Sequence, residues 1–287
     1  MNPELLVDYS CVIGENPLWH PLEKRVYWTD IATGRLFWYD PVTGEHACCY
    51  QGEPVGGFTI QPDGALLLFG TRGAIKLWRP GQLTTVIVEI PAERDSRFND
   101  VIADPVGRVF CGTMPTGDQP GSLYRLGTDG QLTHLFGDVL CSNGLAFSFD
   151  RKQLYYTDSY RYTIYRFAYD LTSGEITDRQ TFLEIPKELG FPDGMTLDSE
   201  GCLWSAIWDG GCLIRFSAAG EEMLRIPFPA RKVSSLTFGG PGYQDIYITT
   251  AGGEHKDIEG AGAGALFRLR LGISGNAEYP SRITLPV

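Results

Sequence analysis

The sequence predicts an all-β protein, a six-bladed β-propeller whose four-stranded antiparallel blades surround a central channel. Its composition is one reason, since 287 residues include 35 Gly and 18 Pro with 12% aromatics, which favours many short strands joined by tight turns. No long window has helical periodicity. The main reason is a unit of four strand signals that recurs six times along the chain.

Each unit combines short apolar or aromatic runs with turn signals between them. The first three units have signals at 15–20, 25–30, 35–40 and a strand ending near Tyr50; at 56–60, 65–69, 74–78 and 83–88; and at 99–103, 108–111, 122–126 and 132–136. The last three have signals at 143–147, 153–158, 163–167 and 179–183; at 193–197, 202–206, 212–216 and 223–226; and at 234–238, 245–249 and 265–269.

The sixth unit lacks a fourth strand of its own, and a chain terminus must supply it. Leu5–Tyr9 and Arg282–Pro286 are the two candidates. Pairing of terminal strands would close the ring and remove free sheet edges. Successive units start 41 to 50 residues apart without a Pro/Gly-rich linker, so we expect a single domain over residues 1–287, with a β-sandwich as the alternative.

Charge and cysteine content exclude several classes of function. A formal net charge of −11 argues against a nucleic-acid partner, because phosphate binding needs clustered Lys and Arg. No apolar run is long enough to cross a membrane and no signal peptide is recognisable, so we expect a cytoplasmic protein. Because a closed propeller can be stable by itself, we expect a monomer. Seven scattered cysteines without a Cys-x-x-Cys pair argue against disulfides and thiolate zinc sites, and the Cys48–Cys49 pair receives no role.

The repeat places polar residues at one equivalent position of the first strands. Asp193 lies between Pro192 and Gly194, a tripeptide typical of turns, and Pro and Gly are expected to turn it toward the channel. The equivalent residues of the six units are Glu15, Gly56, Asn99, Asn143, Asp193 and Ser234. First strands of a propeller follow the channel, so these residues should form a ring at one end of it.

Such a ring would be costly without a cation, because neighbouring carboxylates repel and desolvate each other. Two carboxylates and one or two amide oxygens suit Ca²⁺, Mg²⁺ or Mn²⁺, and the same site can take Zn²⁺ or Fe²⁺. The sequence therefore predicts one divalent metal ion, without deciding which.

The chain resembles the senescence-marker-30/gluconolactonase/luciferin-regenerating-enzyme (regucalcin-like) family over nearly its whole length. The motifs that carry the resemblance are Gly14-Glu15-Asn16-Pro17-Leu18-Trp19, Arg97-Phe98-Asn99-Asp100, Gly112-Thr113-Met114, Ser142-Asn143-Gly144-Leu145, Pro192-Asp193-Gly194 and Phe238-Gly239-Gly240.

The resemblance implies a six-bladed propeller with one divalent metal held by Glu15, Asn143 and Asp193. It also implies that Arg97 and Asn99 contact a sugar substrate, with Asn99 meeting the metal directly or through water. In animal members of the family an acidic residue that follows Gly-Thr-Met helps to hold the substrate.

This chain departs from that pattern, because the aligned position is Gly117. The neighbouring Asp118 is the candidate replacement for substrate binding.

Family likeness and ligand chemistry together predict hydrolysis of a sugar lactone, such as glucono-1,5-lactone or a pentonolactone. Asp193 would accept a proton from the attacking water, and no covalent nucleophile is evident. Two alternatives stay open, a non-catalytic calcium-binding or regulatory propeller and a paraoxonase-like lactonase or esterase. The latter is weakened because the histidines share no register in the repeat: His20, His46, His134 and His255.

Overall fold

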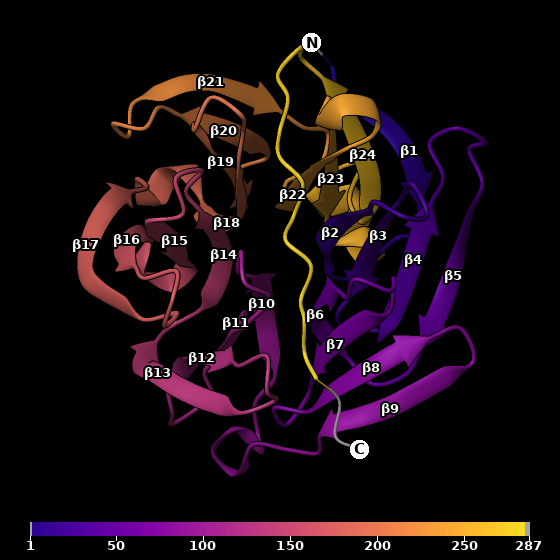
Figure 1. Ribbon diagram of the computed structural model, residues 1–287. Helices are drawn as coiled ribbons and strands as arrows, with labels where there is room; N and C mark the ends of the chain where they lie inside the picture. Colours follow the sequence, from indigo (N-terminus) through magenta and orange to yellow (C-terminus); the bar gives the residue numbers. More distant parts are fainter. Residues whose placement is uncertain (1, 285–287) are drawn as a thin grey trace.

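The computed structural model describes residues 2–284, which form six four-stranded antiparallel sheets arranged in a ring (Figure 1). The first strands of neighbouring sheets contact one another around the central channel, and the later strands of each sheet lie progressively farther out. The predicted six-bladed β-propeller is therefore confirmed.

Blades one to three follow one another in sequence order. Their strands are β2 (Gly14–His20), β3 (Arg25–Asp30), β4 (Arg35–Tyr39) and β5 (His46–Gln51); β6 (Val55–Ile60), β7 (Leu66–Gly70), β8 (Ile75–Arg79) and β9 (Gln82–Ile87); and β10 (Phe98–Ala103), β11 (Val109–Thr113), β12 (Gly121–Leu126) and β13 (Leu132–Val139).

Blades four to six complete the ring. Their strands are β14 (Ser142–Phe147), β15 (Gln153–Asp158), β16 (Thr163–Tyr169) and β17 (Ile176–Glu184); β18 (Phe191–Leu197), β19 (Leu203–Trp208), β20 (Cys212–Phe216) and β21 (Glu222–Pro227); and β22 (Val233–Gly239), β23 (Asp245–Thr250), β24 (Ala265–Arg270) and β1 (Glu4–Asp8).

In the part of the chain that the structure describes, helical structure is confined to short connections. These are the 3-10 turns η1 (Pro91–Glu93), η2 (Ser159–Arg161), η3 (Lys187–Leu189), η4 (Pro241–Tyr243) and η5 (Gly253–His255), and the α-helix α1 (Lys256–Glu259). Within residues 2–284 no helix has the length and apolar character needed to span a membrane.

The N-terminal strand closes the ring. Strand β1 pairs antiparallel with β24, from Glu4 opposite Arg268 to Asp8 opposite Ala265. Of the two candidates for the missing strand, the N-terminal one is therefore confirmed. The C-terminal one is wrong for residues 282–284, which leave the sixth blade altogether, while Leu285 and Pro286 lie outside the described residues.

Aromatic side chains fill the spaces between blades. Trp19 of the first blade stacks on Tyr247 of the sixth at 6.0 Å between ring centroids, and Trp204 of the fifth meets Phe238 of the sixth edge to face at 6.4 Å. Because each large aromatic side chain buries much apolar area, this packing gives the channel rigid walls.

Every innermost strand departs from regular pairing near the predicted ring position. The register shifts between Glu15 and Leu18 in β2, Val55 and Gly57 in β6, Phe98 and Val101 in β10, Asn143 and Leu145 in β14, Pro192 and Met195 in β18, and Val233 and Ser235 in β22. Such bulges insert unpaired residues and redirect side chains. They bring the polar residues toward the channel.

The Pro-Asp-Gly sequence lies inside strand β18 and does not form a turn. Gly194 is not left-handed, and a Cβ on it would lie 2.6 Å from Cβ of Ser235. The expected turn is therefore replaced by a bulge, and Gly194 is required because β22 approaches closely.

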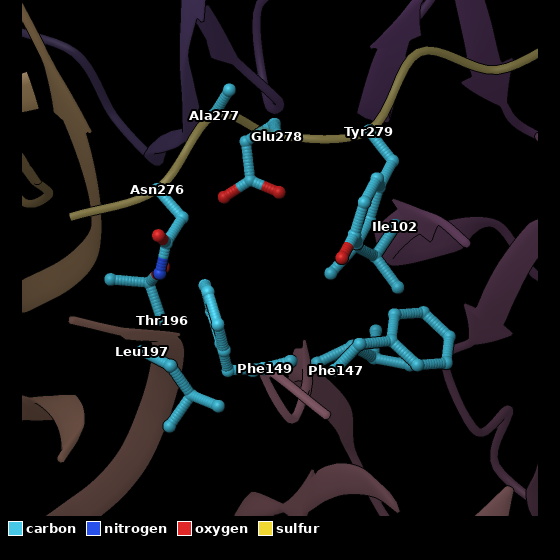
Figure 2. A pocket seen from close by; sticks show the side chains of 11 residues that line it. Ile102, Phe147, Phe149, Thr196, Leu197, Asn276, Ala277, Glu278 and Tyr279 are labelled. Carbon is cyan, nitrogen blue, oxygen red and sulfur yellow. The ribbon is translucent and has the colours of Figure 1, made fainter. Parts of the chain in front are cut away.

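The C-terminal segment crosses the opposite end of the channel (Figure 1, yellow). Gly275 N donates to Tyr243 O at 2.8 Å near the sixth blade, and Ser281 N donates to Ile60 O at 2.9 Å in the second. Between these anchors the Glu278 carboxylate points into a pocket beneath the ring, between the side chains of Asn276 and Tyr279 (Figure 2). The segment thus covers the end of the channel that lies away from the predicted ring.

Burial, with a smaller contribution from the charge of Asp100, raises the pKa of Glu278 to about 7. The folded protein therefore holds this proton more tightly than the unfolded chain, and stability falls as pH rises from about 4.5 through about 7. We expect Glu278→Gln to raise the free energy of unfolding by about 2 kcal/mol at pH 8 and by less at pH 5. Urea denaturation at both pH values tests this, with the exposed Glu45→Gln as control. An equal change in the free energy of unfolding at both pH values would contradict the raised pKa of Glu278.

Candidate active site

The predicted polar residues meet at one end of the channel. Glu15, Asn99 and Asn143 are each the second residue of an innermost strand, and Asp193 is the third residue of β18. All four line a cavity of about 330 Å³ together with Arg97, and all four are at most 9% exposed.

The other two ring positions serve the packing of the blades. A Cβ on Gly56 would lie 1.9 Å from the carbonyl oxygen of Phe98, so the approach of β10 to β6 excludes any side chain there. The Ser234 hydroxyl donates to Gly14 O at 2.5 Å and links the sixth blade to the first. Neither residue lines the cavity.

Hydrogen bonds orient both ring amides. Asn99 Nδ2 donates to Ser142 O at 2.7 Å and to Asn143 Oδ1 at 3.1 Å. Asn143 Nδ2 in turn donates to the Ser159 hydroxyl at 2.9 Å. Each amide oxygen accepts one hydrogen bond, Asn99 Oδ1 from Arg97 and Asn143 Oδ1 from Asn99, and the second lone pair of each oxygen is left to receive a ligand.

The ring carboxylates are strongly perturbed. Burial and the charge of Asp100 raise the pKa of Glu15 to about 8, although the Asn16 backbone N–H opposes the shift. Burial, followed by the charges of Glu15 and Asp100, raises the pKa of Asp193 well above its ordinary value. Among the described residues, buried Asp193 Oδ1 has no hydrogen-bond partner.

These features fit a divalent cation. An orphaned buried carboxylate oxygen, a second carboxylate nearby and oriented amide oxygens form the oxygen-rich set that hard cations prefer. A cation would also relieve the repulsion between the carboxylates. The residues that fit the ion are therefore Glu15, Asn143 and Asp193, with Asn99 beside them.

Arg97 adds a positive charge to the cavity wall. Its guanidinium donates to Phe98 O at 2.9 Å and to Asn99 Oδ1 at 2.6 Å, and burial lowers its pKa. Since the guanidinium is held by two groups of β10, the strand that follows Arg97, it is preorganised to donate to a ligand.

Asp118 lies apart from these residues. It is exposed in the β11–β12 loop and does not line the cavity, and the space around a hypothetical Cβ at Gly117 is open. The structure therefore does not bring Asp118 together with Arg97 and Asn99, and its role in substrate binding stays a prediction.

Sequence reasoning missed two acidic residues. Asp100 follows Asn99 and by strand alternation should point away from the channel, but the β10 bulge brings its charge close to Glu15 and Asp193. Asp209 follows the second strand of the fifth blade and lines the cavity. The second strands of the first and fourth blades end at Asp30 and Asp158. This recurrence of an aspartate at the end of the second strand is a signal that could have identified Asp209.

The part of the cavity wall outside the ring of polar residues is mainly apolar. Tyr160 and Phe191 meet edge to face at 5.7 Å, and Trp208 and Met114 line the same space. The Cys141 thiol also faces the cavity, but burial and nearby Asp193 raise its pKa to about 12, which argues against a thiolate nucleophile. Among the described lining residues there is no histidine.

Comparison with known proteins gives a consistent family. The family model described as "SMP-30/Gluconolactonase/LRE-like region" matches residues 13–252. The chain is 46% identical over 289 residues to the pentonolactonase XacC of Haloferax volcanii, with 98% of each chain covered. It is 35% identical over 283 residues to regucalcin of Gallus gallus, covering 93% of this chain and 94% of that protein.

Solved structures agree with this result. A luciferin-regenerating enzyme superposes with a TM-score of 0.90 at 27% identity, covering 98% of this chain and 100% of the other. The family resemblance carried by the sequence motifs is thereby confirmed. The chain belongs to the SMP-30/gluconolactonase/LRE-like family.

Proposed function

We propose that the protein hydrolyses a sugar lactone to the corresponding aldonic acid and that the reaction requires one divalent metal ion. The observation that carries the proposal is Oδ1 of Asp193, which has no hydrogen-bond partner among residues 2–284 and lies in a cavity that also contains Arg97 and Asn99. The pentonolactonase relative, which matches the chain end to end, supports the same substrate class.

Glu15, Asn143 and Asp193 would hold the ion, with Asn99 close enough to join them. A divalent ion at this position supplies Lewis-acid polarisation of the lactone carbonyl. Its identity among Ca²⁺, Zn²⁺, Mn²⁺, Mg²⁺ and Fe²⁺ stays open, since carboxylate and amide oxygens accept all of them.

Asp193 accepts the proton of the attacking water. The water oxygen bonds to the carbonyl carbon, the bond from this carbon to the ring oxygen then breaks, and Asp193 returns its proton to the departing ring oxygen, which becomes a hydroxyl group of the open acid. Arg97 and Asn99 hold the hydroxyl groups of the substrate, which fixes the carbonyl relative to Asp193.

Arg97 favours an enzyme over the alternative of a non-catalytic calcium-binding protein. A guanidinium beside the ring weakens the attraction of the site for a cation, whereas it can donate to substrate hydroxyls. A paraoxonase-like mechanism has less support, because the described cavity lining contains no histidine.

A pH-stat assay with glucono-1,5-lactone and pentono-1,4-lactones tests the proposal. The metal-loaded protein should hydrolyse at least one of these lactones at least about 100-fold faster than the chelator-treated protein does. Heat-denatured protein with the same metal concentration is the control. If the loaded protein accelerates none of these lactones although it binds the ion, the calcium-binding alternative replaces the enzyme.

A further inference from the structure

Asp209 is the carboxylate in the described cavity lining that does not belong to the ring of polar residues. It lies in the β19–β20 turn of the fifth blade, immediately after Trp208. The ring already provides Glu15 and Asp193, so a third acid on the cavity wall requires its own explanation.

The backbone holds Asp209 in a fixed position. Its φ of 63° lies in the left-handed region, which Asp and Asn tolerate better than most residues. Gly211 N donates to Arg231 O at 2.9 Å and ties the turn to the following segment. The carboxylate is therefore presented by a rigid turn.

Two cations lie beside this carboxylate. Asp209 Oδ1 is 3.4 Å from Arg231 Nε and 3.7 Å from Lys232 Nζ, distances that give attraction without a hydrogen bond. Lys232 also pairs with Glu259 and lies over the Trp208 ring, 5.7 Å from its centroid. The cations offset the negative charge that Asp209 adds to the cavity.

One oxygen of Asp209 still lacks a hydrogen bond within residues 2–284. Oδ1 is buried beside the two cations, whereas the side chain as a whole is 26% exposed, so Oδ2 is the oxygen that is accessible to a ligand. A carboxylate offers only acceptor sites, so the ligand group that complements it is a donor such as a hydroxyl. Asp118, the acid expected from the sequence to hold the substrate, does not line this space.

We propose that Asp209 determines substrate specificity by accepting hydrogen bonds from lactone hydroxyl groups that face away from the ring of polar residues. The inference rests on the proposed lactonase function. Asp209 thereby selects polyhydroxylated sugar lactones over lactones of the same ring size that carry no hydroxyl groups.

The test compares glucono-1,5-lactone with unsubstituted tetrahydropyran-2-one, followed as substrate or as competitive inhibitor. Asp209→Ala should lower kcat/KM for the sugar lactone about 10- to 100-fold, mainly through KM. For the unsubstituted lactone, kcat/KM or the inhibition constant should change by less than about twofold. Asp178→Ala, the same substitution at an exposed left-handed position outside the cavity, is the matched control and should leave both unchanged.

Asp209→Asn is the control for misfolding of the alanine variant, because Asn tolerates the same left-handed backbone conformation. It should show a smaller loss in the same direction, with an unchanged melting temperature. Equal losses for both lactones, or none for the sugar lactone, would overturn the role of Asp209 and leave the lactonase function intact. Wild-type protein that opens no sugar lactone would overturn the proposed function itself.

Discussion

Asp193→Asn should lower kcat for lactone hydrolysis by about 100- to 10,000-fold, the range of a lost general base. The substitution keeps the shape of the side chain and one oxygen that can face an ion, so part of the metal affinity should remain. Steady-state kinetics and metal titration by calorimetry, performed on the same preparation, separate these two effects. Full activity in this variant would exclude Asp193 as the base.

The same variant should be more stable than the wild type without metal. The raised pKa of Asp193 means that the buried carboxylate is less stable in the folded protein than in the unfolded chain, and Asn removes this cost. We expect a gain of about 2 kcal/mol in the free energy of unfolding in chelator at pH 8.

A buried structural aspartate provides the matched control. Asp198 accepts from Trp204 Nε1 at 2.9 Å and from Arg215 Nε at 2.8 Å. Asp198→Asn should therefore lower stability and leave kcat of the folded fraction nearly unchanged. Loss of stability in Asp193→Asn would show that the carboxylate has a structural role instead.

Binding of the divalent ion should release protons, and its apparent affinity should rise with pH. In the metal-free protein Glu15, with a pKa of about 8, retains its proton at neutral pH, and the raised pKa of Asp193 makes this carboxylate bind a proton more tightly than an ordinary aspartate. An ion binds the deprotonated carboxylates, so each proton released gives about a tenfold rise in affinity per pH unit. The rise should extend from pH 6 to about pH 8 and then flatten.

Calorimetry in two buffers with different ionisation enthalpies counts the released protons. Glu15→Gln is the informative variant, because it should bind the ion more weakly and release fewer protons. Removal of the ion by a chelator should lower the melting temperature of the wild type, since the ion binds only the folded chain. Affinity that is constant from pH 6 to pH 8, without proton release, would exclude these two carboxylates as ligands.

Much of the fold followed from local patterns. Strand signals depend on the alternation of side chains, which adjacent residues already specify, and their sixfold recurrence predicted the propeller. The same register placed Glu15, Asn99, Asn143 and Asp193 at equivalent positions. The structure confirms the propeller and brings these four side chains to one cavity.

Contacts between distant segments were outside the reach of these patterns. The sequence left two terminal candidates for the last strand, and only the packed ring pairs β1 with β24. The repeat register assigned no role to Asp100, whereas the bulge in β10 brings its charge beside Glu15. A bulge depends on how two strands pair and on which blade lies next to them, so adjacent residues do not specify it.

The sequence by itself thus determined the number of blades and the residues that can form the ring, because periodicity is a local property of the chain. Only the tertiary structure decided which carboxylates share the cavity, with Asp209 lining it and Asp118 outside it. The pKa values of the ring acids were likewise decided there, because burial and the distances between charges exist only once the blades have packed around the channel.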